Sequence, residues 1–235
     1  MQLSERLETL IRLAGKGQAA ADVGTDHGFV PIELVRRGLF KRVIASDVRK
    51  GPLKAAGEHV RQAGLEEQIT LRLGDGLKVV GPGEAEVILI SGMGGALIQR
   101  ILMEGEETAK TAKRLILSPQ SEIPAFRTFL QTHGYRISGE ALICEEKKYY
   151  FLLTAEPGTQ EPWMGADRLY GKYLLEQGGE TVATYVKKRK AVLERILRNL
   201  ELAEETEVAQ RRQEAEEELR LTEEALSAVC QTGGN

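Results

Sequence analysis

Short apolar runs alternate with amphipathic segments through the first half of the chain. Apolar residues recur at helical spacing over 3–14, and the segment Gly15-Lys16-Gly17 ends that helix. The runs that favour strands are 19–23, 43–46, 69–73, 86–90 and 114–117, and the helical patterns between them are 31–37, 51–63, 94–103 and 123–132. Alternating strands and helices predict a parallel sheet with helices on both faces.

The alternation changes after the fifth strand. Residues 135–144 and 149–154 are strand-like runs separated only by the polar segment 145–148. Two adjacent strands with no helix between them predict an antiparallel hairpin. The sheet should therefore end in a hairpin instead of another strand–helix crossover.

A linker-like segment at 156–162 predicts a first domain at 1–160 and a second at 161–235. In the second, 163–177 favours a helix. Mostly apolar positions then repeat at alternating steps of four and three over 182–203 and 208–229, with Arg189 and Arg212 as imperfections and a polar break near 204–207. This spacing keeps one stripe on one helix face, so we expect an antiparallel two-helix coiled coil.

The composition narrows the setting in which the protein works. Cys144 and Cys230 are the only cysteines and lie far apart, which favours a reducing cytoplasm over a disulfide scaffold. No stretch approaches the roughly 18–20 apolar residues of a membrane span, and the first residues lack the layout of a signal peptide. The histidines and cysteines show no metal-ligand spacing, so no metal site is predicted.

A glycine-containing turn follows the first predicted strand, in the segment Asp22-Val23-Gly24-Thr25-Asp26-His27-Gly28. Such a turn between a strand and a helix can cradle a nucleotide-like ligand. Asp26 would repel the pyrophosphate of a dinucleotide, whereas S-adenosylmethionine carries a sulfonium and an ammonium that tolerate a carboxylate. The alternative is that Gly24 and Gly28 form only a tight turn.

Three further segments follow the next strands in order. Asp47 can accept hydrogen bonds from ribose hydroxyls, although NAD enzymes place an acid similarly and a helix N-cap is the alternative. Asp75 and Gly76 follow the third strand. In methyltransferases an acid at this place commonly accepts a hydrogen bond from the adenine amino group; the alternative is a plain Asp-Gly turn. Ser91-Gly92-Met93-Gly94-Gly95 follows the fourth strand, where glycines allow either ligand approach or close packing.

These segments resemble the bacterial tRNA (adenine(22)-N1)-methyltransferase family. The Asp26-His27 pair and the segment Ser91–Gly95 carry most of the specificity, and the likeness extends over the C-terminal hairpin. The resemblance implies a Rossmann-like class I methyltransferase fold, an α/β architecture with a mostly parallel seven-stranded sheet whose last strand is antiparallel. It also implies methylation of N1 of adenosine 22, in the D-arm region of tRNA, with S-adenosylmethionine as the cofactor. The residues expected around the cofactor are Asp22, Gly24, Thr25, Asp26, His27, Gly28, Asp47, Asp75, Gly76, Ser91, Gly92, Met93 and Gly94.

The segment after the fourth strand also bears on the chemistry. Enzymes that methylate the exocyclic adenine amino group usually place an Asn/Asp-Pro-Pro-aromatic motif there, and this chain has Ser91-Gly92-Met93-Gly94 instead. N1 already carries an in-plane lone pair, so the need is to stabilise the positive charge that develops on the ring. We expect Asp26 to fill that electrostatic role and His27 to position the base or take a proton. The alternative is that both bind only the methionine part of the cofactor.

Charge is distributed unevenly along the chain. Residues 1–160 hold 21 Lys and Arg against 20 Asp and Glu, and residues 161–235 hold 11 against 15, so net charge neither supports nor excludes RNA. The local basic runs predicted to contact tRNA phosphates are Lys187, Lys188, Arg189 and Lys190 on the first coiled-coil arm, and Arg36, Arg37, Lys41 and Arg42 near the cofactor loop. The alternative is that the basic and acidic arms neutralise each other.

Other functions remain open on the sequence alone. The protein could methylate another RNA or a small molecule, act as an NAD-dependent oxidoreductase, or serve as a non-catalytic coiled-coil adaptor. We expect a monomer, with dimerisation through the coiled coil as the alternative.

Overall fold

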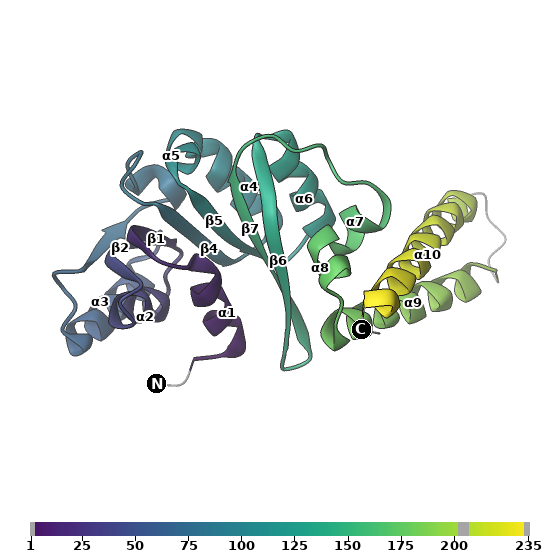
Figure 1. Ribbon diagram of the computed structural model, residues 1–235, viewed down its shortest axis with the longest axis horizontal. Helices are drawn as coiled ribbons and strands as arrows, with labels where there is room; N and C mark the ends of the chain where they lie inside the picture. Colours follow the sequence, from purple (N-terminus) through teal and green to yellow (C-terminus); the bar gives the residue numbers. More distant parts are fainter. Residues whose placement is uncertain (1–2, 202–206, 233–235) are drawn as a thin grey trace. The chain divides into compact units, whose positions relative to one another are not determined.

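The computed structural model describes residues 3–201 and 207–232, and the chain has two compact units, Met1–Glu161 and Pro162–Asn235. Figure 1 labels most of the helices and strands of both units. The elements of the first unit are α1 (Glu5–Ala14), β1 (Gly17–Val23), α2 (Phe29–Arg36), β2 (Phe40–Asp47), α3 (Lys50–Ala63), β3 (Ile69–Leu73), a 3₁₀ turn (Gly76–Val79), β4 (Val87–Met93), α4 (Gly95–Glu104), α5 (Glu106–Thr111), β5 (Arg114–Pro119), α6 (Ile123–Thr132), β6 (Tyr135–Glu145) and β7 (Lys148–Pro157).

The seven strands form one sheet in the order β3-β2-β1-β4-β5-β7-β6. The first five strands are parallel, and β7 runs antiparallel to both β5 and β6. The order turns back between β1 and β4, because the chain moves outward through β2 and β3 and then returns past β1. The predicted fold class, including the antiparallel last strand, is confirmed.

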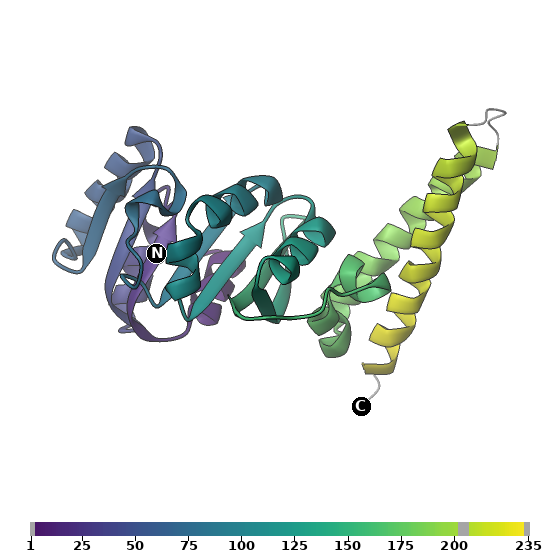
Figure 2. The same ribbon diagram turned by 90° about the horizontal axis from the view of Figure 1, so that it is seen from above.

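Helices cover both faces of this sheet (Figures 1 and 2). α2 contacts both α1 and α3, and α4 contacts both α5 and α6. The connections through α2 and α3 run to one side of β1, and the connection through α4 runs to the other side. Because these crossovers are right-handed, the two groups of helices lie on opposite faces of the sheet. The central strands have apolar middle segments for this reason: Ile88–Ile90 of β4 and Leu115–Leu117 of β5 are fully buried.

The β6–β7 hairpin turns where the sequence predicts. Glu145 pairs with Lys148, and the two residues between them, Glu146 and Lys147, have φ of 49° and 65°. Positive φ at both central residues matches the right-handed twist of the flanking strands. The chain achieves this turn without glycine.

The second unit contains α7 (Gly165–Tyr170), α8 (Lys172–Gln177), α9 (Glu180–Glu201) and α10 (Glu207–Thr232). The single helix expected over 163–177 is wrong. Gly171 has φ of 98°, a conformation that ends one helix before the next begins. The break predicted near 204–207 falls almost entirely outside the described residues.

α9 and α10 pack against each other along the predicted stripes. Val186 and Leu193 are buried on α9, as are Thr222 and Val229 on α10. Arg212 departs from the expected stripe, because it is exposed and its Nε lies 3.0 Å from Glu216 of the same helix.

Candidate functional site

A cavity of about 610 Å³ opens at the carboxyl ends of β1, β2, β3 and β4. This is where the strand order turns back, and ligands of open α/β sheets bind at such points. Most of the residues predicted to surround a cofactor line it, namely Asp22, Gly24, Thr25, Asp26, His27, Asp47, Asp75, Gly76, Ser91, Gly92 and Met93. Gly28 and Gly94 do not line it. They are the residues at which α2 and α4 begin, and Gly28 instead allows α2 to approach Ala56 of α3.

The loop after β1 is fixed to the end of β2. The backbone N–H groups of Gly24 and Thr25 both donate to the carbonyl of Ser46, at 2.8 and 2.9 Å. Gly24 has φ of 79°, and a Cβ at this position would collide with the methyl group of Met93. The positive φ therefore favours glycine here, and a larger residue would also require the flexible end of the Met93 side chain to move.

Two carboxylates lie buried at adjacent strand ends, with Asp22 on β1 and Asp47 on β2. Burial raises the pKa of Asp22 to about 6, because desolvation disfavours its charged form. The hydroxyl of Thr25 opposes this effect, and the negative charge of Asp47 adds to it. Asp22 is therefore harder to ionise than an exposed aspartate.

The two carboxylate oxygens of Asp47 differ in their hydrogen bonding. Its Oδ1 accepts a hydrogen bond from the backbone N–H of Arg49 at 2.8 Å, which tightens the turn into α3. Arg49 itself is the N-cap residue, so the alternative prediction that Asp47 caps the helix is wrong. Within residues 3–201 and 207–232, its Oδ2 accepts no hydrogen bond. A ligand in the cavity can therefore donate to Oδ2.

Asp75 is held at the rim by cations. Lys78 donates to its carboxylate at 3.2 Å, and Arg100 of α4 lies 3.3 Å away. These contacts, led by the Lys78 hydrogen bond, hold the pKa of Asp75 below its usual range. Glu104 completes the cluster by pairing with Lys78 at 2.6 Å. Arg100 lines the cavity and was not predicted.

The end of β4 is irregular. Its pairing with β5 shifts register between Ser91 and Met93, and Gly92 has φ of 77°. A bulge of this kind turns the strand and redirects the next side chain. It places Met93 over Gly24, so that the flexible thioether forms part of the cavity wall.

Asp26 and His27 stand at the mouth of the cavity. Their side chains are 62% and 52% exposed, and His27 Nε2 lies 3.6 Å from Asp26 Oδ2. The His27 ring stacks on Phe29 with centroids 5.5 Å apart, and Phe29 stacks on His59 at 5.2 Å. His59 was not among the predicted site residues. Its Nδ1 lies 2.8 Å from the His27 carbonyl oxygen, a contact that only the packing of α3 beside α2 creates.

A second cavity of about 260 Å³ lies beside this aromatic cluster. Phe29 lines both cavities, and His59 lines the second. Flat aromatic surfaces therefore lie next to the cofactor-sized cavity.

Arg6 of α1 was also not predicted, and it lines the larger cavity beside Leu7. Its guanidinium carbon lies 4.9 Å from the centre of the Tyr150 ring on β7. No sequence motif includes this residue. Only the packing of α1 against β4, β5 and the hairpin strands brings it to the site.

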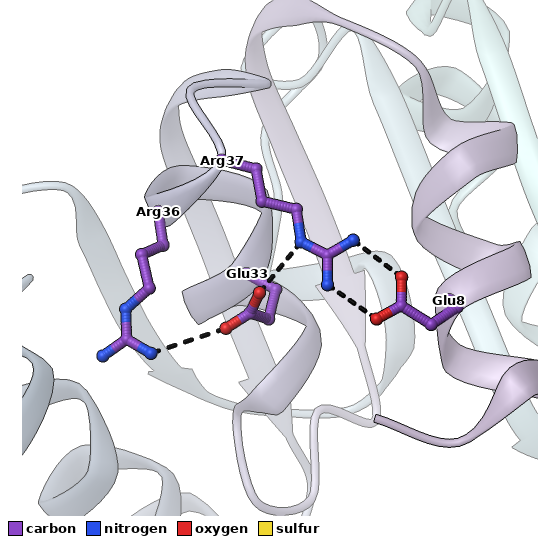
Figure 3. A network of polar contacts seen from close by, with 4 residues as sticks. All are labelled: Glu8, Glu33, Arg36 and Arg37. Carbon is purple, nitrogen blue, oxygen red and sulfur yellow. Dashed lines mark hydrogen bonds and ion pairs between the residues drawn. The ribbon is translucent and has the colours of Figure 1, made fainter. Parts of the chain in front are cut away.

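The predicted basic patch near the cofactor loop does not form as expected. Arg37 is committed to carboxylates: it makes two hydrogen bonds of 2.7 Å to Glu8 and one of 2.9 Å to Glu33 (Figure 3). Arg36 pairs with Glu33 at 3.5 Å. Lys41 and Arg42 are exposed but lie at the amino end of β2. Arg42 is five positions before Asp47, which places it about 16 Å from the cavity end of the strand.

The predicted basic run on α9 is partly neutralised by α10. Arg189 makes two hydrogen bonds to Glu218, at 2.6 and 2.8 Å, and Lys190 pairs with Glu223 at 2.8 Å. Lys187 and Lys188 are exposed. Within the described part of the chain, Lys187 makes no ion pair.

Two features are missing from the described parts of the chain. Residues 3–201 and 207–232 contain no group of three His, Cys, Asp or Glu side chains that could hold a metal ion. None of the helices they form is long and apolar enough to cross a membrane.

The sheet order, the antiparallel β7 and the carboxylates that follow β1, β2 and β3 around one cavity define a class I methyltransferase. The model of a family described as methyltransferase domain matches residues 3–153. The Bacillus subtilis tRNA (adenine(22)-N1)-methyltransferase is 35% identical over 193 residues, which is 80% of each chain.

Solved structures agree with this comparison. The B. subtilis m1A22 tRNA methyltransferase TrmK is 30% identical, with a TM-score of 0.87 over 96% of this chain and 99% of that one. A Streptococcus pneumoniae protein, provisionally described as a tRNA (m1A22) methyltransferase and solved with S-adenosyl-L-methionine, is 34% identical, with a TM-score of 0.86 over 96% and 100%. The chain belongs to the tRNA (adenine(22)-N1)-methyltransferase family.

Proposed function

We propose that the protein transfers the methyl group of S-adenosylmethionine to N1 of adenosine 22 in tRNA. The observation that carries this proposal is one cavity that gathers Asp22, the Gly24 loop, Asp47 and Asp75 at the point where the strand order turns back. The family relationship supplies the substrate.

The cavity suits the cofactor in size and chemistry. Its volume of about 610 Å³ lies in the range of small-molecule sites. Asp47 keeps one carboxylate oxygen available for ribose hydroxyls, and Asp75 can accept from the adenine amino group at the rim. Asp22 and Asp26 would face the positively charged end. When bound, S-adenosylmethionine supplies an electrophilic methyl group.

The chain's own residues then have to hold and stabilise the base. N1 has a free lone pair, so no group needs to remove a proton before it reacts. Positive charge builds on the adenine ring as N1 is methylated, and a carboxylate at the cavity mouth stabilises that charge. The exposed side chain of Asp26 at this mouth supports that role, and His27 Nε2 lies 3.6 Å from Asp26 Oδ2. We assign Asp26 the electrostatic role and His27 the positioning role.

The base must leave its stack in the RNA, because N1 is hidden in a paired adenine. The stacked rings of His27, Phe29 and His59 offer a surface for an extruded base beside the cofactor cavity. Base–aromatic stacking is worth about 1–3 kcal/mol per base. This surface supports a nucleobase as the methyl acceptor.

For the RNA backbone we propose one face of α9. Lys187, Arg195 and Arg198 are exposed and fall within about 80° of one another around the helix axis. Within the described residues none of the three makes an ion pair, unlike Arg189 and Lys190. We call these three residues the α9 basic face. Its phosphate contacts would position the tRNA without reading its bases.

The activity is tested by incubating the full chain with S-adenosylmethionine and unmodified tRNA, followed by nucleoside mass spectrometry. The digest is kept near neutral pH, because 1-methyladenosine rearranges to the N6 isomer in base. We expect 1-methyladenosine. N6-methyladenosine as the initial product, or no methylation of tRNA, would refute the proposal.

A further inference from the structure

The second cavity, of about 260 Å³, lies between α2 and α3 and has no part in the cofactor binding proposed above. It is lined mainly by Phe29, Ile32 and Arg36 of α2 and by His59, Gln62 and Ala63 of α3. These positions follow the spacing of three, four and seven residues that places side chains on one face of a helix. The two helices therefore turn one face each toward a common space.

The walls of this cavity suit one flat ring system. Phe29 and His59 stack with centroids 5.2 Å apart, and Ile32 beside them is buried. The volume is below the roughly 300–1,000 Å³ of sites for drug-sized molecules, so it fits a single base better than a whole nucleotide. Unstacked RNA bases bind proteins by stacking on aromatic rings and by hydrogen bonds to their edges.

Polar groups at this cavity can bind a base edge and a phosphate. His59 Nδ1 lies 2.8 Å from the carbonyl oxygen of His27, so Nδ1 donates and Nε2 of the neutral ring is an acceptor. Gln62 offers a donor and an acceptor, and within the described parts of the chain its side chain makes no hydrogen bond. Arg36 is exposed and meets Glu33 only at 3.5 Å, a surface pair that contributes little, so it can turn to a phosphate.

Phe29 connects this cavity to the site of methyl transfer, because it lines both cavities. Asp26 and His27 line only the larger one, so a base in the second cavity is not the base that reaches the cofactor. Apolar side chains that insert between successive bases unstack them. Phe29 therefore lies where it can separate the target adenine from the base next to it.

We propose that the second cavity binds the base of the nucleotide adjacent to adenosine 22, with Phe29 as the wedge between the two bases. This assignment rests on the proposed function. Extrusion of adenosine 22 removes a stacking partner from its neighbour, and stacking of that neighbour on Phe29 and His59 offsets part of the cost. The enzyme thereby gains a second recognition point beside the reactive adenine.

The test combines one change in the RNA with one change in the cavity. Transcripts that lack the base at position 21 or at position 23 are compared with the intact transcript. With the wild-type protein, kcat/KM should fall about 5- to 150-fold for one of the two, the range for one stacked base. Ala63→Phe in the full chain fills the cavity. It should lower kcat/KM for the intact transcript by a similar factor and abolish the effect of the missing base.

Binding of S-adenosylhomocysteine, measured by calorimetry, shows whether each variant is folded and should stay within about two-fold of the wild type. Gln62→Ala, at an exposed position, takes the place of Ala63→Phe if the latter does not fold. It should cost about 2- to 10-fold on the intact transcript, the range for one neutral hydrogen bond, and reduce the effect of the missing base by the same factor. Gln18→Ala, exposed at the amino end of β1, is the matched control and should behave like the wild type.

Three results would overturn the proposal. The missing base could impair the cavity variants as much as the wild type, which would place its effect in the fold of the RNA. Neither incomplete transcript could be impaired, or a folded Ala63→Phe protein could methylate the intact transcript at the wild-type rate. If the wild-type protein does not methylate adenosine 22 of the intact transcript, the proposed function itself fails, a result obtained before any variant is made.

Discussion

At the scale of single residues, the cavity gathers carboxylates whose surroundings differ sharply. Asp22 and Asp47 are buried, Asp75 is held by Lys78 and Arg100, and Asp26 is 62% exposed. The same functional group can therefore carry different tasks. The buried pair suits cofactor binding, and the exposed carboxylate is available to the substrate.

Asp26→Asn removes the charge while keeping the shape. We expect kcat/KM for tRNA to fall about 10²- to 10³-fold, because stabilisation of the developing ring charge is lost. Affinity for S-adenosylhomocysteine should change little. Steady-state kinetics and calorimetry measure the two quantities. Glu67→Gln, an exposed acid at the opposite end of the sheet, serves as the control. A parallel loss of cofactor affinity would assign Asp26 to cofactor binding.

Asp22→Asn should stabilise the protein near neutral pH. The folded pKa of Asp22 is about 6 against an ordinary value of 3.8, so the folded state binds more protons and wild-type stability falls as pH rises between these values. The difference corresponds to about 3 kcal/mol at pH 7 and vanishes below pH 4. Urea unfolding at several pH values measures it. A variant less stable than the wild type at pH 7 would contradict the assigned pKa.

At the scale of elements, a buried ion pair joins α6 to the β6–β7 hairpin. Arg127 Nε donates to Glu140 Oε1 at 2.7 Å, and both side chains are almost completely inaccessible to solvent. Removal of one partner leaves an uncompensated buried charge, which typically costs about 3–5 kcal/mol. The intact pair adds little net stability, but it holds α6 and β6 in position, because breaking it is costly.

Glu140→Leu should lower the free energy of unfolding by about that amount, about 3–5 kcal/mol. The double variant Arg127→Met/Glu140→Leu should recover most of the loss, because no unpaired charge remains. Denaturant titration followed by far-UV circular dichroism measures both. A double variant as unstable as Glu140→Leu would show that the charge balance is not the cause.

Sequence patterns located the elements better than they located the site. The strand at 69–73 and the helix at 123–132 have the predicted bounds, because local periodicity and punctuating Gly and Pro residues define them. Arg6, Arg100 and His59 were missed because only tertiary packing brings them to the cavity mouth. The commitment of Arg37 to Glu8 was also invisible, since 29 residues separate the partners.

At the scale of the whole molecule, the two units divide the proposed work. The first unit contains the cofactor cavity, and the second presents the α9 basic face. α10 is acidic and occupies Arg189 and Lys190. The α9 basic face is thus our proposed RNA-binding surface in a chain whose net charge is −3.

Lys187→Ala/Arg195→Ala/Arg198→Ala should weaken tRNA binding and leave S-adenosylhomocysteine binding unchanged. Each phosphate contact in the wild-type complex releases counterions from the RNA, and the triple variant loses up to three such contacts. The magnitude of the slope of log K against log salt should therefore fall by about 2 to 3. Filter binding over a range of salt concentrations measures this slope. Lys41→Ala/Arg42→Ala, at the opposite end of β2, is the comparison. An unchanged slope in the triple variant would exclude the α9 basic face.

The most direct measurement compares two tRNA transcripts that differ only in adenosine or guanosine at position 22. Each is incubated with the full chain and methyl-labelled S-adenosylmethionine, and the label is mapped by nuclease digestion and mass spectrometry. We predict one 1-methyladenosine at position 22 in the first transcript and no label in the second. Equal labelling of both transcripts, or label at another position, would contradict the account.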